Sequence, residues 1–285
     1  NAVVALGQTG SKILIPNPFY QVYTVAAMAI GAQSVYLPAW AESGFLPDLD
    51  ALTPEELNQT SVFFLCSPSN PQGVVASEAY WTRLLALAET YDFKIFADEC
   101  YSEIYRTAPP PGALQVAAQM GADPERVVAF HSLSKRSNLP GLRSGFLASG
   151  SKNISRIKQL RAYAGCPVAG PIQHVSAKVW SDEDHVVANR QLYCGKFEVA
   201  DRIFAGIKSY NSPEAGFFLW LPVEDDEAAA LKLWTETGLR VLPGSYLGQI
   251  ANEQNPGSGY IRVALVAPKE EMQRGLNILR DCLYK

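Results

Sequence analysis

The stretch "RVVAFHSLSKRSNLPGLRSGF", residues 126–146, joins an apolar run to an abrupt cluster of hydroxyl and cationic side chains. Its first half is typical of a buried β-strand, because branched and aromatic residues dominate it. The run stops where Ser132, Ser134, Lys135 and Arg143 begin, and hydroxyls and cations together suit an anion. The stretch therefore predicts a strand with an anion site at its carboxyl end and one lysine, Lys135, beside that site.

Apolar runs of the same kind recur through the first half of the chain, separated by helical patterns. The runs are "KILIP" (12–16), "SVYLP" (34–38), "SVFFLCS" (61–67), "FKIFADE" (93–99) and "SGFLAS" (144–149). The helical patterns are "YQVYTVAAMAIG" (20–31), "SEAYWTRLLALAETY" (77–91) and "PGALQVAAQM" (111–120). Runs that are apolar on both faces indicate a mostly parallel sheet sandwiched by helices. The sequence thus predicts an α/β fold whose ligands gather at the carboxyl ends of the strands.

The second half of the chain has a different pattern. Residues 151–210 read as helix, broken by Pro167 and Pro171, and indicate a connector. After it, the strand-like runs "GFFLWLPV" (216–223), "LRVLPG" (239–244) and "GYIRVALV" (259–266) alternate with the helical "DDEAAALKLWTETG" (225–238) and "PKEEMQRGLNILRDCLYK" (268–285). We therefore predict a large ligand-binding domain over 1–165, followed over 166–285 by connector helices and a smaller C-terminal α/β domain.

Composition narrows the class of partner. The 285 residues are 48% hydrophobic with a formal net charge of −4, which favours a globular protein and argues against a nucleic-acid partner. No apolar stretch is long enough to span a membrane, so we expect no membrane partner. The three histidines, His131, His174 and His185, lack the spacing of a metal site, so we expect no metal.

The cysteines indicate a reducing compartment. They are odd in number and far apart, with no CxxC pair: Cys66, Cys100, Cys166, Cys194 and Cys282. A disulfide framework is not expected from such spacing. Because the sequence also opens without a secretory signal, we predict free thiols in a cytoplasmic protein.

Two short motifs have ordinary explanations. Ser132-Leu133-Ser134-Lys135 matches the S-x-x-K of penicillin-recognising serine enzymes, but their S-D-N and K-T-G companions are absent. "GQTGSK" (7–12) resembles a phosphate-binding loop, yet only two residues separate its glycines where four are needed. We interpret it as a turn into the next strand.

Polar residues follow several of the predicted strands at the point where each strand ends. They are Asn70, Asp98, Tyr101, Ser132, Lys135 and Arg143. Taken alone, Asp98 is also consistent with the cap of a helix over "ECYSEIY" (99–105), and "SPSNPQG" (67–73) with an ordinary turn. Because parallel strands end at one edge of a sheet, the spacing brings these side chains together.

With these residues in place, the chain resembles the class I/II aminotransferases of the fold-type I pyridoxal phosphate (PLP) enzymes. Four motifs carry the resemblance, in the family's order and across nearly the whole chain: "SPSNPQG", "ADECYSEIY", "SLSKRSNLPGLRSGF" and "GYIRVAL". Any one of them is weak evidence, whereas the four together are specific. The resemblance implies a PLP-dependent transaminase that moves an amino group between amino acids and 2-oxo acids.

The resemblance also assigns roles around the reacting atoms. Lys135 is the lysine that holds the cofactor's aldehyde and, once freed, moves the substrate's Cα proton. Asp98 pairs with the protonated ring nitrogen and keeps the ring an electron sink. Tyr101 and Asn70 donate to the ring's phenolate oxygen. Asn70 also belongs to the expected substrate site.

The remaining assignments concern the two anions. Ser132, Ser134 and Arg143 hold the cofactor phosphate, the arginine as a planar fork. Arg262, in the middle of "GYIRVALV", clamps the substrate's α-carboxylate. Tyr20 stacks on the pyridine face, with Phe19 as the competing candidate. Arg136 receives no role, and a solvated or interface charge is expected there.

The resemblance further implies features outside this sequence. In the family a Gly-rich phosphate-binding turn comes before the helix that begins here at Asn1, so we expect an N-terminally truncated chain whose phosphate pocket is incomplete. We also expect a homodimer with its active site at the subunit interface.

Two alternative functions stay open, and the sequence indicates only a class of substrate. A carbon-sulfur β-lyase of the same fold has nearly the same residues. A transcription regulator in which this fold senses PLP behind a DNA-binding domain is the rival of another class. The lysine motif resembles most the succinyldiaminopimelate aminotransferases, with glutamate as amino donor.

Overall fold

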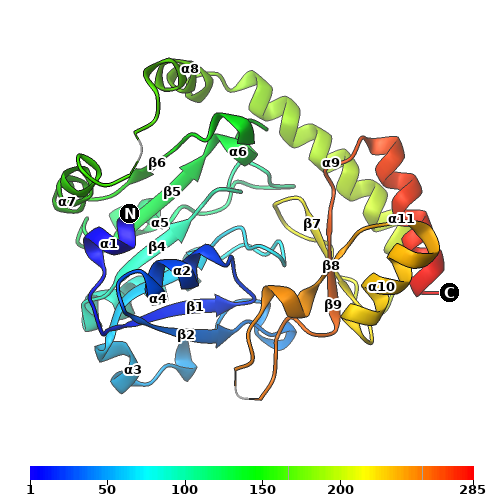
Figure 1. Cartoon of the computed structure of the whole chain (residues 1–285), viewed down its shortest axis with the longest axis horizontal. Helices are drawn as coiled ribbons and strands as arrows, with labels where there is room; N and C mark the ends of the chain where they lie inside the picture. The colour runs from blue at the N-terminus through cyan, green and yellow to red at the C-terminus, as the bar shows by residue number, and fades with distance from the viewer. Residues whose placement is uncertain (166, 252) are drawn as a thin grey trace.

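A computed structural model describes residues 1–165, 167–251 and 253–285, and its strands form two sheets (Figure 1). The larger sheet has six strands in the order β2-β1-β3-β4-β5-β6. Its strands are β1 (Lys12–Asn17), β2 (Gln33–Pro38), β3 (Thr60–Cys66), β4 (Lys94–Asp98), β5 (Val127–Ser132) and β6 (Gly145–Ala148). The first five pair in parallel, and β6 runs antiparallel to β5. The predicted mostly parallel sheet is confirmed.

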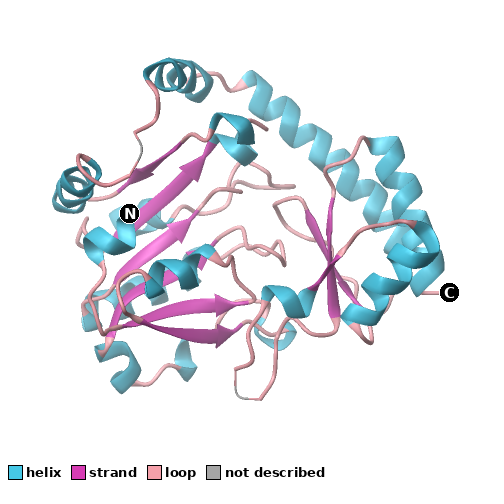
Figure 2. Cartoon of the chain, in the orientation of Figure 1, coloured by secondary structure: helices cyan, strands magenta, loops and turns pink. Residues whose placement is uncertain are grey.

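Helices cover both faces of this sheet, as the two-sided apolar runs predicted (Figure 2). Alternate strand residues separate into two cores, because successive side chains point to opposite faces. Leu14, Phe63 and Ile95 pack with α3 (Pro54–Asn58), α4 (Glu78–Tyr91) and α5 (Ala113–Met120). Ile13, Val62 and Phe96 pack with α1 (Ala2–Leu6), α2 (Val22–Met28) and α7 (Ser151–Arg161).

Three helices form the connector between the sheets. They are α7, α8 (Gly170–Trp180) and α9 (Asp184–Phe204). The interpretation of Pro171 as a helix breaker is wrong, since this proline occupies the first turn of α8. A proline is tolerated there because the first N–H groups of a helix have no partner inside the helix.

The C-terminal part builds a three-stranded antiparallel sheet in the order β7-β9-β8. The strands are β7 (Phe218–Pro222), β8 (Leu242–Pro243) and β9 (Tyr260–Ala264). Helix α11 (Lys269–Leu283) packs beside α9, and α10 (Asp226–Thr237) packs against α11, β8 and β9. Phe197, Leu219, Leu233 and Leu276 belong to the core that joins them. The short 3₁₀ turns η1 (Ala41–Ser43), η2 (Leu49–Ala51), η3 (Pro140–Leu142) and η4 (Gly244–Leu247) complete the fold.

The turn after β3 contacts the segment that leads into β7 and so helps to attach the C-terminal part to the large sheet. Gly73, in the turn after β3, accepts backbone hydrogen bonds from the N–H groups of Glu214 and Ala215. Its φ is 72°, and a Cβ there would lie 2.6 Å from Cβ of Pro213. Only glycine fits so close an approach in that conformation. The "SPSNPQG" turn is therefore also a docking point for the chain that leads into β7.

The structure also gives the state of the cysteines and tests whether any described helix could span a membrane. Cys66, Cys100, Cys194 and Cys282 are unpaired, and Cys166 lies outside the described residues. Within the described ranges, no helix has both the length and the apolar character that crossing a membrane requires.

Candidate active site

The carboxyl ends of β3, β4 and β5 open into a cleft of about 600 Å³ that reaches to β9. Neighbouring strand ends are in register: Cys66 pairs with Asp98, and Asp98 pairs with Phe130. The lining includes every residue that the sequence predicted for the site, namely Tyr20, Asn70, Asp98, Tyr101, Ser132, Ser134, Lys135, Arg143 and Arg262. Side chains from both halves of the chain thus meet in one hollow.

Lys135 stands on a single helical turn at the end of β5. The turn, α6 (Leu133–Arg136), is capped by Ser132, whose Oγ accepts a hydrogen bond of 3.1 Å from the backbone N–H of Ser134. The two serine hydroxyls lie 2.9 Å apart. A strand that passes straight into a capped turn therefore delivers both hydroxyls and the lysine to the same cleft.

The amine of Lys135 lies among aromatic rings and cations. Its Nζ is 5.1 Å from the ring centre of Phe217 and 5.9 Å from that of Tyr101. Burial lowers the pKa of this amine, and the positive charges of Arg262 and Arg143 lower it further, against opposing contributions from Cys100 and Asp98. Because a lysine with a lowered pKa is more often neutral, it is better suited to act as a base or nucleophile.

The carboxylate of Asp98 is fixed from two sides. Its Oδ2 accepts a 2.6 Å hydrogen bond from the hydroxyl of Tyr23, and its Oδ1 accepts a 3.2 Å bond from the backbone N–H of Cys100. Burial and the neighbouring carboxylate raise the pKa of Tyr23 well above its usual value, so the phenol keeps its proton and donates. Residues 99–104 form turns, so Asp98 does not cap a helix.

Arg262 and Asn70 form a polar pair on the far wall. Nη1 of Arg262 donates to Oδ1 of Asn70 at 2.9 Å, joining β9 to the turn after β3. The guanidinium lies 4.4 Å from the ring centre of Phe218. Asn70 uses its oxygen in this contact, which leaves its amide N–H groups as donors for a ligand.

Arg143 lies in the bend between β5 and β6. Its φ of 51° is left-handed, and its Nη1 donates to the carbonyl of Pro140 at 3.1 Å. The hairpin closes tightly after it, because Ser132 pairs with Gly145 across the two strands. A Cβ at Gly145 would lie 2.4 Å from the carbonyl oxygen of His131, so this position admits only glycine. The bend thus returns Arg143 to the side of Ser132.

The structure separates the two aromatic candidates of the "NPFYQVY" segment. Tyr20 lines the cleft and is 52% exposed, with its ring edge-on to Tyr23 at 5.9 Å. Phe19 is buried in the core and stacks on Tyr36 at 5.1 Å. Only Tyr20 is therefore in a position to contact a ligand in the cleft.

Sequence reasoning missed Tyr23 and Phe217. Tyr23 occupies a buried helix face and stacks on Phe64 at 4.4 Å, which is the pattern of a core aromatic. Phe217 precedes β7 within an apolar run. The signal in reach was the three-residue spacing of Tyr20 and Tyr23, which in a helical pattern places both side chains on one face. Nothing in the sequence indicated that Phe217 faces the lysine.

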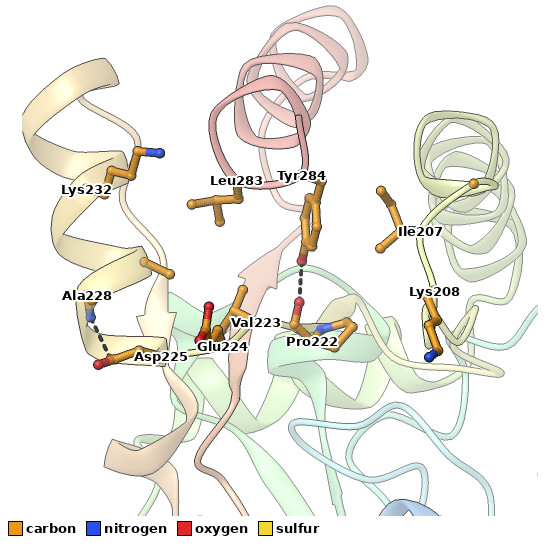
Figure 3. Close-up of a pocket in the computed structure, with 12 residues that line it drawn as sticks. Ile207, Lys208, Pro222, Val223, Glu224, Asp225, Ala228, Lys232, Leu283 and Tyr284 are labelled. Carbon is orange, nitrogen blue, oxygen red and sulfur yellow. Dashed lines mark hydrogen bonds between the residues drawn. The ribbon is translucent and has the colours of Figure 1, made fainter.

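A second and larger hollow lies in the C-terminal part (Figure 3). It measures about 710 Å³ and is bordered by the end of α9, the end of β7, α10 and the end of α11. Its polar groups bond mostly to nearby backbone: the Tyr284 hydroxyl donates to the carbonyl of Pro222, and the Asp225 side chain accepts from the N–H of Ala228. None of the predicted site residues lines this groove.

Comparisons with known proteins show the family of the chain. The family model described as aminotransferase class I and II matches residues 1–279. The LL-diaminopimelate aminotransferase of Syntrophobacter fumaroxidans is 29% identical over 295 aligned residues, covering 99% of this chain and 71% of that relative.

Solved structures with the same fold include two aminotransferases. An aminotransferase from Neisseria meningitidis superposes with a TM-score of 0.92 at 38% identity, covering 98% of this chain and 72% of that one. A probable N-succinyldiaminopimelate aminotransferase from Thermus thermophilus superposes with a TM-score of 0.87 at 26% identity, covering 99% and 74%.

Proposed function

Because this chain belongs to the class I and II aminotransferase family, a family of PLP-dependent enzymes, we propose that the cleft between β4, β5 and β9 is its active site. The protein is an aminotransferase that moves an amino group between an amino acid and a 2-oxo acid. One observation carries the placement of the site: Asp98, Lys135, Arg143 and Arg262 converge from separate elements on one hollow.

The donor set of the cleft fits PLP. The cofactor offers a basic ring nitrogen, an aldehyde and a phosphate, which call for a carboxylate, an amine and a cationic group with donors. Asp98, Lys135 and the group of Arg143, Ser132 and Ser134 match these needs in turn. When bound, PLP supplies the electron sink that stabilises negative charge at the substrate Cα.

Asp98 acts in this proposal as a hydrogen-bond acceptor. Tyr23 and the N–H of Cys100 both donate to its side chain, which fixes its orientation and leaves acceptor sites for the N–H of the ring nitrogen. The charge-assisted bond is worth about 1.5–3 kcal/mol in binding. Its share in catalysis is larger where charge develops on the ring.

Lys135 acts as the proton carrier. The neutral amine would take the proton from the substrate Cα as a general base and then give it to the carbon of the cofactor's former aldehyde group as a general acid. Burial, with Arg262 and Arg143, favours the neutral amine that the first step needs. Phe217 and Tyr101 bound the space in which Nζ moves.

Arg262 orients the substrate. Its guanidinium, fixed by Asn70 and resting on Phe218, presents further N–H groups to an α-carboxylate in a bidentate arrangement. This pair explains a preference for amino acids and 2-oxo acids over plain amines. Domain roles follow: residues 1–165 hold the cofactor, while the connector and C-terminal domain, 166–285, supply the carboxylate clamp.

For the substrate, we propose a diaminopimelate or N-succinyldiaminopimelate skeleton with glutamate as the amino partner. The names of the Syntrophobacter and Thermus proteins support it, together with the likeness of "SLSKRSNLPGLRSGF". The test incubates PLP-loaded protein with 2-oxoglutarate and LL-diaminopimelate, N-succinyl-LL-diaminopimelate, alanine, aspartate or phenylalanine, and measures glutamate. Turnover highest with a diaminopimelate derivative supports the proposal. Turnover only with the other donors contradicts it, and oxo-acid release without an acceptor indicates a lyase.

We also propose a homodimer in the cytoplasm. Tyr20 and Tyr246, at 52% and 60% exposure, leave aromatic surface beside the cleft that a second subunit would cover. The unpaired cysteines suit a reducing compartment. Light scattering at assay concentration checks the dimer, and fully active monomers contradict it.

A further inference from the structure

Helix α6, the turn that carries Lys135, is too short to keep its own shape. It has four residues, and a single helical turn is unfavourable alone because nucleation fixes several dihedral angles for one hydrogen bond. Ser132 caps its start, and Leu133 is fully buried. The end of the turn, next to Lys135, depends on contacts with another part of the chain.

Arg136 supplies most of those contacts. It is only 6% exposed, which rules out the solvated charge, one of the two alternatives expected from the sequence. Its guanidinium donates to the carbonyls of Val179 at 3.2 Å and Trp180 at 3.5 Å, pairs with Glu183, and lies 4.9 Å from the ring centre of Trp180. It thus binds the carboxyl end of α8, where carbonyls lack helical partners and a cation is favoured.

Two neighbours add to the same attachment. The hydroxyl of Ser137 lies 2.8 Å from Nε2 of His185, at the start of α9. Nδ2 of Asn189 reaches the backbone carbonyls of Lys135 and Arg136, at 3.4 and 3.5 Å. Residues 179–189 therefore bind the lysine turn through Arg136, Ser137 and the backbone, and α6 contacts α8 and lies near the start of α9 (Figure 1).

We propose that Arg136 is a positioning residue for Lys135, anchoring α6 to the α8–α9 connector so that the amine stays in place in the cleft. Consecutive helix residues point about 100° apart, so one side chain enters the cleft while the next enters the connector. The inference rests on the proposed role of Lys135. A shift of the turn by about 1 Å costs on the order of 10²-fold in rate, because the amine must meet the substrate Cα.

The test compares Arg136→Met with Arg126→Met. Arg126 precedes β5 at its other end and is a matched control, because it is also largely buried and pairs with Asp92 and Glu89. Three quantities are measured for both variants: amide hydrogen exchange over residues 133–138 of the apoprotein, the pH at which the absorption of lysine-bound PLP changes, and kcat with KM for the amino donor.

Arg136→Met is expected to speed exchange over 133–138 by at least about tenfold, since the anchored turn opens more easily. The absorption titration moves by at least about 0.5 pH unit. kcat falls about 10- to 100-fold while KM changes less than about threefold, because donor binding depends on Arg262. Arg126→Met lowers the melting temperature but leaves all three quantities near those of the unmodified protein.

The proposal is overturned if Arg136→Met only lowers the melting temperature, as Arg126→Met does, with exchange and absorption unchanged. Should Arg136→Met not fold, Arg136→Lys replaces it, because it keeps the charge and loses the planar fork. Hydrogen exchange over 133–138 is then expected to be at least about threefold faster. An unchanged exchange rate in Arg136→Lys would overturn the proposal. If PLP reacts with a lysine other than Lys135, the proposed function fails, while exchange over 133–138 still decides whether Arg136 anchors the turn.

Discussion

The active-site cleft and the C-terminal groove are similar in size, and they are built in different ways. The cleft of about 600 Å³ joins strand ends of the large sheet to β9, whereas the groove of about 710 Å³ lies within the C-terminal part (Figure 3). In the groove, Lys232 donates to the carbonyl of Cys282, and Tyr284 and Asp225 also serve the backbone. In the cleft, the charges of Asp98, Arg143 and Arg262 all act on the pKa of Lys135. Converging unlike charges mark an active site, and volume does not.

The largest expected contrast between the hollows is in their lysines. Lys135→Ala removes the amine that binds PLP and carries the proton, so transamination falls at least about 10⁴-fold, the upper end for acid-base catalysis. Lys232→Ala, in the groove, leaves kcat and KM within about twofold, since surface changes away from a site cost little. Steady-state glutamate formation measures both. Equal losses in the two variants would remove the distinction.

The aspartates come next. Asp98→Asn keeps the shape but cannot stabilise a protonated ring nitrogen, so kcat at saturating PLP falls about 10²- to 10³-fold. Asp225→Asn is its counterpart in the groove, and because asparagine caps a helix as well as aspartate, no loss is expected. A decrease under about tenfold for Asp98→Asn would make this residue a structural group only.

The arginine clamp should show a smaller loss, confined to substrate binding. Arg262→Lys keeps the charge but loses the planar fork, so kcat/KM falls about 10- to 100-fold, mostly through KM. Arg240→Lys is the control in the same part of the chain, since Arg240 lies over Trp234, 4.8 Å from its ring centre, and is not among the residues that line the cleft. An unchanged KM in Arg262→Lys would assign the α-carboxylate to another group.

The tyrosines give the smallest contrast. Tyr23→Phe and Tyr284→Phe each remove one hydroxyl, bonded to Asp98 and to the carbonyl of Pro222, and each lowers stability by about 0.5–1.5 kcal/mol. Only Tyr23→Phe should also weaken PLP binding, by about two- to tenfold. Equilibrium titration of the apoprotein with PLP measures this. Equal affinities in the two variants would show that Tyr23 does not support Asp98.

The fold was largely predictable because the strands of the large sheet are recognisable in the sequence. Runs such as "SVFFLCS" (61–67) are apolar on both faces, which only a covered, mostly parallel sheet explains, and the six predicted strands are present. Polar residues at the ends of these runs share one sheet edge as a matter of geometry. The convergence of Asp98 and Lys135 therefore followed from strand direction.

What the sequence did not reveal depends on contacts far along the chain. Arg136 received no role from the sequence because its partners lie 43 to 47 residues further on, in α8 and just after it. Tyr23 received no role because its hydroxyl reaches Asp98, which lies 75 residues further along the chain. Pro171 was misread because a proline inside a helical pattern signals either a break or a start.

The central claim, that Lys135 in the cleft is the residue that binds PLP, has a direct test. PLP-loaded protein is reduced with borohydride, digested and mapped by mass spectrometry for the pyridoxyl group. The account predicts the added mass on the peptide that contains Lys135, and its loss in Lys135→Ala. The same mass on Lys208 or Lys232 of the groove, or on any other lysine, would contradict it.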